Sequence, residues 1–421
     1  MIRHPKRLFR FRRKAAIPAH FWVAITLALA PISQAWAKNE PINYSLSGDM
    51  GAQFLTFSDN PAHPDQSNSN PQPSFHLSPR VSMPLPWKLD DGRARITAKP
   101  FIRYDSVDPQ RSKLDIRELY LFVDQGEWGM RLGVLQEHWG ILEGRRLIDV
   151  INQIDLVEDP RGKEKLGQPG IHSNILLPDG QLDFYLLLGH RNRTFPGRKG
   201  RFRGSSPVVG EATFTSGASA RTPSYAVRYG TTQDILDVGV SLFYGLDREP
   251  NLILSSSTNT YTPEYRKVGQ MGIDIQATLD HIVLKLEALE RRGLKKNDNV
   301  SAVSTGMEYT FVRSIGAWDI GVLGEYYWQD QGVDAPSSTF DDDFLVGSRI
   351  TFNDAGDSKL LLGVMIDHRR KDGALSMEYE TWLNDGWTLK LSGSMFKTKY
   401  DNILSGLKND DYIKTEFICN F

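Results

Sequence analysis

The stretch "GAWDIGVLGEYYWQD", from Gly316 to Asp330, alternates apolar residues with small, polar or charged ones. The apolar set is Trp318, Ile320, Val322, Tyr326 and Trp328, and the other set is Asp319, Gly321, Glu325 and Gln329. Because successive side chains of a β-strand point to opposite faces, each set occupies one face of a strand. The stretch therefore predicts a β-strand that separates two very different environments.

The same alternation recurs along the chain in segments of about ten residues or more, whereas strands of soluble sheets typically have about five or six. About nine to eleven tilted residues cross a bilayer as a strand. The pattern therefore predicts an all-β chain that forms a transmembrane barrel with its apolar positions facing lipid. These positions are Met271, Ile273, Ile275, Ala277 and Leu279; Val303, Met307, Tyr309 and Phe311; Leu375, Met377, Tyr379 and Leu383; and Trp387, Leu389, Leu391 and Met395.

Tight turns, most of them with Gly, Asn or Asp, divide the chain. They lie at 90–93, 125–128, 178–181, 231–234, 279–281, 314–317, 353–358 and 384–387. Other connections, often long, lie near 58–73, 106–113, 141–170, 190–223, 247–265, 292–299, 329–340, 370–373 and 401–410. Together they predict an antiparallel up-and-down barrel of about 18 strands, with 16 as the alternative. Short periplasmic turns, long external loops and two periplasmic termini are expected.

The first 37 residues have the plan of a secretory signal peptide. Seven Lys or Arg and no acid occupy residues 1–14, an apolar run follows, and Ala-Trp-Ala at 35–37 provides a cleavage site. We expect export and cleavage after Ala37, which leaves 38–421 as a barrel in the outer membrane of a Gram-negative cell. Cleavage removes seven of the 50 basic residues and none of the 51 acidic ones, so the exported chain is mildly acidic.

The C-terminal residues "DYIKTEFICNF" continue the alternation. Ile413, Thr415, Phe417, Cys419 and Phe421 share one face. A final strand that ends in Phe, with apolar residues at every second position, resembles the signal that the outer-membrane barrel assembly machinery reads. We therefore expect this machinery to be a partner of the strand that ends at Phe421.

The segment "HWGILEGRRLIDVINQIDLVEDPRGKEKLGQPG", from His138 to Gly170, is a long charged interruption between two predicted strands. Its loop, 141–170, is the third external connection, and porins of Gram-negative outer membranes commonly fold their third loop inward. By this analogy we expect a constriction loop, with a surface lid of mixed charge as the alternative. The residues that could bury one side of a short helix against the barrel wall are Leu147, Ile148, Val150, Ile151, Ile154 and Leu156.

The part from "LGVLQEHWG" through "DVINQIDL" resembles an outer-membrane family catalogued as domain of unknown function 1302. That family shows a Gly, then Trp-Gly, then an Asp/Asn-Val-Ile-Asn-x-x-Asp pattern. The resemblance covers about 25 residues, and the Pro-Asp style ending of many members is replaced here by Gln153-Ile154-Asp155. It implies a channel-like barrel of unassigned substrate. The matching positions are Gly133, Gln136, Trp139, Gly140, Asp149, Val150, Ile151, Asn152 and Asp155.

The residues that alternate with the lipid-facing ones should line the lumen. One wall then carries the cations Arg95, Lys99, Arg103 and Arg131. The other carries the acids Asp274, Glu287, Glu308, Asp319, Glu325, Asp367, Glu378 and Glu380. Such walls would produce a field that orients dipolar solutes, unless the charges form interior ion pairs instead. Within the loop, the candidate constriction residues are Glu143, Arg145, Arg146, Asp149 and Asp155, which either face the pore or pin the loop.

The fourth external connection contains "RNRTFPGRKGRFR", with six basic residues between Arg191 and Arg203 and no acid. It could recruit anionic solutes, but contact with outer-membrane lipid and lipopolysaccharide, or simple solvation, is the favoured interpretation. A surface that faces the medium is not expected to bind nucleic acid. The sequence does not decide the oligomeric state, and a homotrimer is one possibility.

These features favour a channel for passive diffusion of small polar or charged solutes, without enzymatic activity or catalytic residues. The alternatives are a barrel that exports a polymer or a hydrophobic compound, or a structural barrel that works with a partner. His172 and Ser173 could suggest an enzyme, but adjacent strand residues point to opposite faces and cannot easily form a base and nucleophile pair. Because Cys419 is the only cysteine, haem attachment and multi-cysteine metal sites are excluded, and we expect no cofactor or metal.

Overall fold

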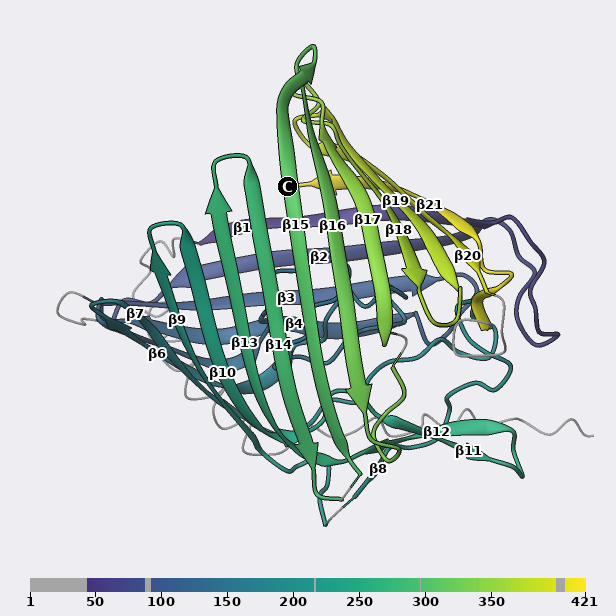
Figure 1. Cartoon of the computed structure of the whole chain (residues 1–421), viewed down its shortest axis with the longest axis horizontal. Coiled ribbons are helices and arrows are strands. Elements are labelled where there is room, and N and C mark those ends of the chain that lie inside the picture. The colour runs from purple at the N-terminus through teal and green to yellow at the C-terminus, as the bar shows by residue number, and fades with distance from the viewer. Residues whose placement is uncertain (1–43, 88–91, 216, 296, 339, 399–405) are drawn as a thin grey trace, which may run out of the picture.

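The computed structural model describes residues 44–87, 92–215, 217–295, 297–338, 340–398 and 406–421. Within them, 18 strands form one closed antiparallel barrel (Figure 1). The predicted fold class and strand number are thereby confirmed. The strands are β1 (Ser45–Phe57), β2 (Gln72–Pro84), β3 (Arg93–Asp105), β4 (Lys113–Asp124), β5 (Trp128–Leu135), β6 (Gln168–Leu177), β7 (Gly180–Leu187), β9 (Ser224–Gln233), β10 (Leu236–Leu246), β13 (Lys267–Leu279), β14 (Ile282–Gly293), β15 (Asn299–Ile315), β16 (Trp318–Gln331), β17 (Asp342–Thr351), β18 (Lys359–Asp367), β19 (Gly373–Asn384), β20 (Trp387–Lys397) and β21 (Tyr412–Asn420).

Pairing between the first and last strands closes the barrel. In β1 and β21, Asp49 lies opposite Asn420 and Phe57 lies opposite Tyr412. The start of β1 and the end of β21 therefore share one rim, which also carries the short turns and is called the turn end. The opposite rim carries the longer connections and is called the loop end.

The alternation that decides the fold is visible in β16. Leu323, Glu325 and Tyr327 are buried toward the interior, whereas Trp318 and Val322 are exposed on the outer face. The strand thus has an apolar outer face and an inner face that packs against other parts of the chain. The predicted separation of two environments is confirmed.

The connections follow the predicted order, with shifted limits. Loop 3 comprises residues 136–167, because β5 ends at Leu135 and β6 already begins at Gln168. Loop 4 comprises 188–223 and loop 5 comprises 247–266. Residues 90 and 91 of the first predicted turn, 401–405 of the last predicted loop, and the predicted signal peptide at 1–37 lie outside the described residues.

A second sheet, which the sequence did not predict, forms at the loop end. It joins β8 (Thr213–Phe214) of loop 4 to β11 (Asn251–Ser255) and β12 (Thr260–Tyr265) of loop 5. Figure 1 shows this sheet apart from the barrel wall. These strands have two to six residues, too few for their alternation to stand out in a loop.

In the part of the chain that the structure describes, no helix has the length and apolar character needed to cross a membrane.

Candidate functional site

Loop 3 crosses the lumen. Its two ends are neighbours, because Leu135 of β5 pairs with Gln168 of β6. The loop nevertheless bonds to Glu287 of β14, Glu325 of β16 and Glu378 of β19, which lie across the barrel in strand order. The direction that the sequence left open is therefore inward.

The first half of loop 3 is held by the carboxylate of Glu287, which is fully buried. One carboxylate oxygen accepts the backbone N–H groups of Ile141 at 2.6 Å and Leu142 at 3.2 Å. The other oxygen accepts those of Leu147 at 2.6 Å and Ile148 at 3.3 Å. A charged acceptor strengthens each of these bonds, so a single wall residue holds four backbone groups between residues 141 and 148 of the loop.

Glu325 forms a second anchor of the same kind. Its carboxylate accepts the backbone N–H groups of Glu143 at 2.8 Å and Gly144 at 3.0 Å, and also the hydroxyl of Tyr327. The Tyr327 hydroxyl oxygen lies 3.0 Å from the Gly144 nitrogen. Sequence alternation placed Glu287 and Glu325 in the lumen, but it gave no signal that they bind the loop.

From the last anchored residues onward, the apolar residues of loop 3 pack on the wall. Of the six predicted residues, Leu147, Ile148, Val150 and Ile151 are buried, while Ile154 and Leu156 are half-buried. The segment is irregular, and the predicted short helix does not form. The wall carboxylates satisfy N–H groups that a helix would have bonded internally. Gly272 of β13 allows the close approach, since a Cβ there would lie 2.9 Å from a methyl carbon of Ile148.

Arg248 of loop 5 bonds the middle of loop 3 from the loop end. Its guanidinium donates to the carbonyl oxygens of Val150 at 2.9 Å and Ile151 at 3.0 Å, and to Nδ1 of His190 at 3.0 Å. Burial and the charge of Arg248 lower the pKa of His190 to about 2, so this imidazole is neutral and can accept the bond. Loops 3, 4 and 5 are thereby joined.

The second half of loop 3 is held by ion pairs with β4. Asp155 is fully buried and pairs with Lys113 and, at 2.7 Å, with Arg117. It also accepts a hydrogen bond from Thr194 of loop 4 at 2.6 Å. Burial alone would raise the pKa of Asp155, but Lys113 and Arg117 outweigh it and hold the pKa below its ordinary value. Asp155 therefore pins the loop, which was one of its two predicted roles.

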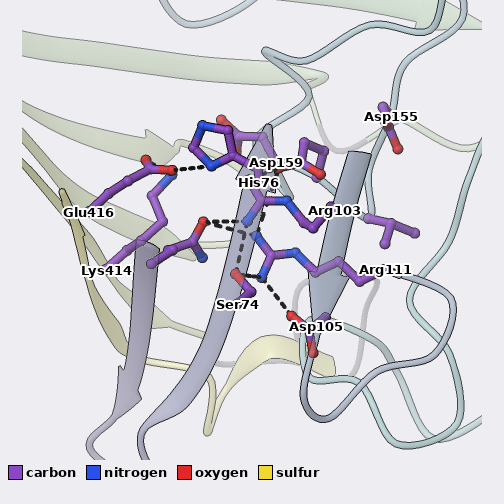
Figure 2. Close-up of polar contacts among 12 residues, drawn as sticks. Ser74, His76, Arg103, Asp105, Arg111, Asp155, Asp159, Lys414 and Glu416 are labelled. Atoms are coloured by element: carbon purple, nitrogen blue, oxygen red, sulfur yellow. Dashed lines mark hydrogen bonds and ion pairs between the residues drawn. The ribbon is translucent and has the colours of Figure 1, made fainter. Parts of the chain in front are cut away.

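Arg103 of β3 also pins loop 3 and does not line open lumen. It is 5% exposed and pairs with Glu158 of the loop at 2.5 Å. Figure 2 shows its guanidinium beside that of Arg111, with Ser74 accepting from Arg103 at 2.8 Å. Arg103, Arg111 and Lys113 hold the pKa of Glu158 below its ordinary value against the opposing effect of burial.

Arg131 of β5 is likewise engaged, at the root of loop 3. It pairs with Glu137 at 2.6 Å and donates to Nδ1 of His172, whose Nε2 lies 2.7 Å from the carboxylate of Asp183. The neighbouring Ser173 pairs in register with outward-facing Phe184, so His172 and Ser173 lie on opposite faces of β6.

Two of the four predicted wall cations remain accessible. Arg95 is exposed and its guanidinium lies 4.8 Å from the ring centre of Phe122. Lys99 is half-buried and, among the residues that the structure describes, has no ion-pair partner. These two side chains are the candidates for contact with a solute.

The remaining candidates of loop 3 also fall into two groups, those with a bonding partner in the described part of the chain and one without. Glu143 pairs with Arg349 at 2.9 Å, Arg145 donates to Gln329 at 2.8 Å, and Asp149 pairs with Lys165. Arg146 is exposed and lacks an ion-pair partner within the described residues. Of the five predicted loop residues, Arg146 is therefore the one left free for the pore.

The acids of the opposite wall are mostly paired. The pairs are Asp274 with Arg228 at 2.7 Å, Glu308 with Arg349 at 3.4 Å, Glu378 with Arg161 at 2.6 Å and Glu380 with Lys390 at 3.0 Å. The alternative of interior ion pairs therefore describes this wall better than a uniform acidic surface.

Loop 4 crosses the mouth of the barrel above loop 3. Arg191 pairs with Asp115, Arg201 with Asp410 and Arg203 with Asp65, at 2.8, 2.6 and 2.7 Å. Asp115 lies on β4, Asp410 lies just before β21, and Asp65 lies in the connection that follows β1. Together with Arg193, which bonds Gln153 at 3.2 Å, four of the six basic side chains are thus used internally, while Arg198 and Lys199 are exposed. The expected external basic surface is correspondingly reduced.

Within the described ranges, no group of three or more His, Cys, Asp or Glu residues is arranged to hold a metal ion.

Comparison with known proteins supports the fold. Neither a protein-family model nor a curated sequence matches the chain, so the resemblance to the family of domain of unknown function 1302 gains no support. Pseudomonas aeruginosa OpdQ superposes with a TM-score of 0.53 at 13% identity, covering 90% of this chain and 98% of its own. OccK5 (OpdH) of the same organism superposes with a TM-score of 0.52 at 9% identity, covering 90% of this chain and 97% of its own. Both neighbours are outer-membrane porins, and at this identity the likeness shows the fold.

Proposed function

We propose that the chain is a porin-like channel of the outer membrane, which lets small polar or charged solutes diffuse passively. The observation that carries this proposal is a charged loop fixed across the polar lumen of a closed barrel with an apolar outer face. The apolar face suits a bilayer, and a polar lumen suits hydrated solutes more than hydrophobic ones.

Solute contact is assigned to Arg95, Lys99 and Arg146. The other predicted residues, Arg103, Arg131, Glu143, Arg145, Asp149 and Asp155, are assigned to holding loop 3 in place. In a narrow lumen with low-dielectric walls, three unpaired cations raise the local concentration of anions. The channel should therefore prefer anions over cations.

The test is reconstitution of residues 38–421 in planar bilayers under a salt gradient. The proposal expects discrete current steps and a reversal potential with the sign of anion preference. Absence of steps from protein whose barrel is intact would reject the channel. The presence of both loop 3 and loop 4 across the interior favours a second candidate in that case, a barrel closed at rest that acts with a partner.

A further inference from the structure

The outer face of the barrel carries an apolar groove near the loop end, between β9 and β14. Its volume is about 470 Å³, and Tyr225, Leu242, Tyr244 and Met271 line it. These four side chains are all more than half exposed. Because their neighbours in sequence, such as Ala226 and Phe243, are buried toward the interior, the groove faces outward.

The groove exists because a glycine stands between two long side chains. In register, Gly269 of β13 lies between Tyr244 of β10 and Arg292 of β14. A Cβ built on Gly269 would meet nothing within 4 Å, so the space above it is open. Tyr244 and Arg292 form the sides of this space, and its mostly apolar lining suits a hydrocarbon chain.

Cations stand over the end of the groove that is nearest the rim. Lys267 lies on the same face of β13 as Gly269, two residues closer to the loop end, and has no ion-pair partner in the described part of the chain. Arg292 has a side chain that is 78% exposed and pairs with Glu290 at 3.0 Å. Lys295, in the connection that follows, is also exposed. At the groove itself, Lys267 and Arg292 against Glu290 leave a net positive charge beside an apolar lining.

We propose that this groove binds one acyl chain of a phosphorylated lipid of the outer leaflet, with a lipid phosphate held by Lys267 and Arg292. The inference rests on the proposed function and on the expected orientation, in which the long loops are external and the loop end lies at the outer leaflet. Tyr225 and Tyr244 lie near the loop end on the outer face, and aromatic side chains of membrane barrels are enriched where lipid head groups begin. The groove would bind the acyl chain of the lipid, and the cations would bind its phosphate.

The test is titration of the purified protein in detergent with bis-phosphorylated lipid A and with enzymatically dephosphorylated lipid A, followed by native mass spectrometry. The phosphorylated form should bind more tightly. Lys267→Gln and Arg292→Gln should each weaken its binding by roughly fivefold, since one cation near an anionic lipid surface contributes about that factor. Binding of the dephosphorylated form should not change in these variants.

Gly269→Phe fills the groove from outside and should weaken binding of both forms. Gly324→Phe is the matched control, because Gly324 of β16 lines a second outer-face hollow of about 480 Å³ and a Cβ there meets nothing within 4 Å. Equal loss in the two glycine variants would show general lipid coating and overturn the proposal. Appearance of protein dimers that Gly269→Phe abolishes, without bound lipid, would also overturn it, in favour of a second copy.

Conductance separates this inference from the proposed function. Steps without site-specific lipid binding would reject the groove alone, whereas lipid binding without steps would reject the channel alone. The two glutamine variants leave every barrel pairing intact, so they test the site even if Gly269→Phe fails to fold.

Discussion

A single carboxylate, that of Glu287, accepts four backbone N–H groups of loop 3. Glu287→Gln keeps one acceptor oxygen and removes the charge, so buried N–H groups lose their partner. Each such loss costs about 1–3 kcal/mol. We predict that amides 141–148 exchange with deuterium roughly ten to a hundred times faster, as measured by mass spectrometry of membrane-reconstituted protein.

The control for this prediction is Glu380→Gln. Glu380 is a lumen acid that pairs with Lys390 and, among the described residues, makes no bond to loop 3. Equal exchange in the two variants would show that Glu287 does not hold the loop.

Lys99 is one of the lumen cations that form no ion pair within the described residues. Lys99→Glu should shift the reversal potential toward cation preference, with Lys99→Gln between the two. Because the Debye length falls from about 10 Å at 0.1 M salt to about 3 Å at 1 M, the shift should be larger at the lower concentration. A reversal potential that does not change at 0.1 M would place Lys99 outside the conduction path.

At the scale of the element, the docking of loop 3 on the barrel wall should depend on pH and weaken in acid. Asp155 and Glu158 have lowered pKa values, so their ionised forms stabilise docking above their ordinary values of 3.8 and 4.5. This stabilisation is lost as pH falls through the lowered values. We predict conductance that is constant from pH 7 to 5 and changes reversibly below about pH 4.

Asp155→Asn removes one of these carboxylates and leaves Lys113 and Arg117 without it. The variant should show increased current noise already at pH 7. A wild-type transition centred between pH 5 and 7 would contradict the role assigned to Asp155 and Glu158.

Loop 4 depends in a similar way on Arg201, which pairs with Asp410 and lies 4.1 Å from the ring centre of Phe57. Loss of one partner of a buried ion pair costs about 3–5 kcal/mol. We predict that Arg201→Ala speeds tryptic cleavage after the exposed Arg198 and Lys199, measured on intact proteoliposomes. Arg221→Ala, an exposed change in the same loop, is the control. Equal cleavage in both would show that loop 4 is not fastened by Arg201.

At the scale of the whole molecule, the barrel could be predicted because its determinants are local. Alternation within each strand, as from Trp318 to Trp328, sets which side chains face outward. The turn residues between the strands set the number of strands. The fastening of the interior could not be predicted in this way, because Glu287 and Ile141 are 146 residues apart. Alternation assigned Arg103 and Glu287 to the inner face of the barrel, but only the folded chain pairs them with loop 3.

The central claim is that loop 3 narrows a conducting barrel, and its direct test is deletion of residues 143–166. Strands β5 and β6 remain adjacent at Leu135 and Gln168, so a short connection can replace the loop. Single-channel recordings of residues 38–421 should show discrete steps, and the deletion should enlarge them and weaken ion selectivity. Steps of equal size and selectivity in both proteins, or no current in either, would contradict the claim.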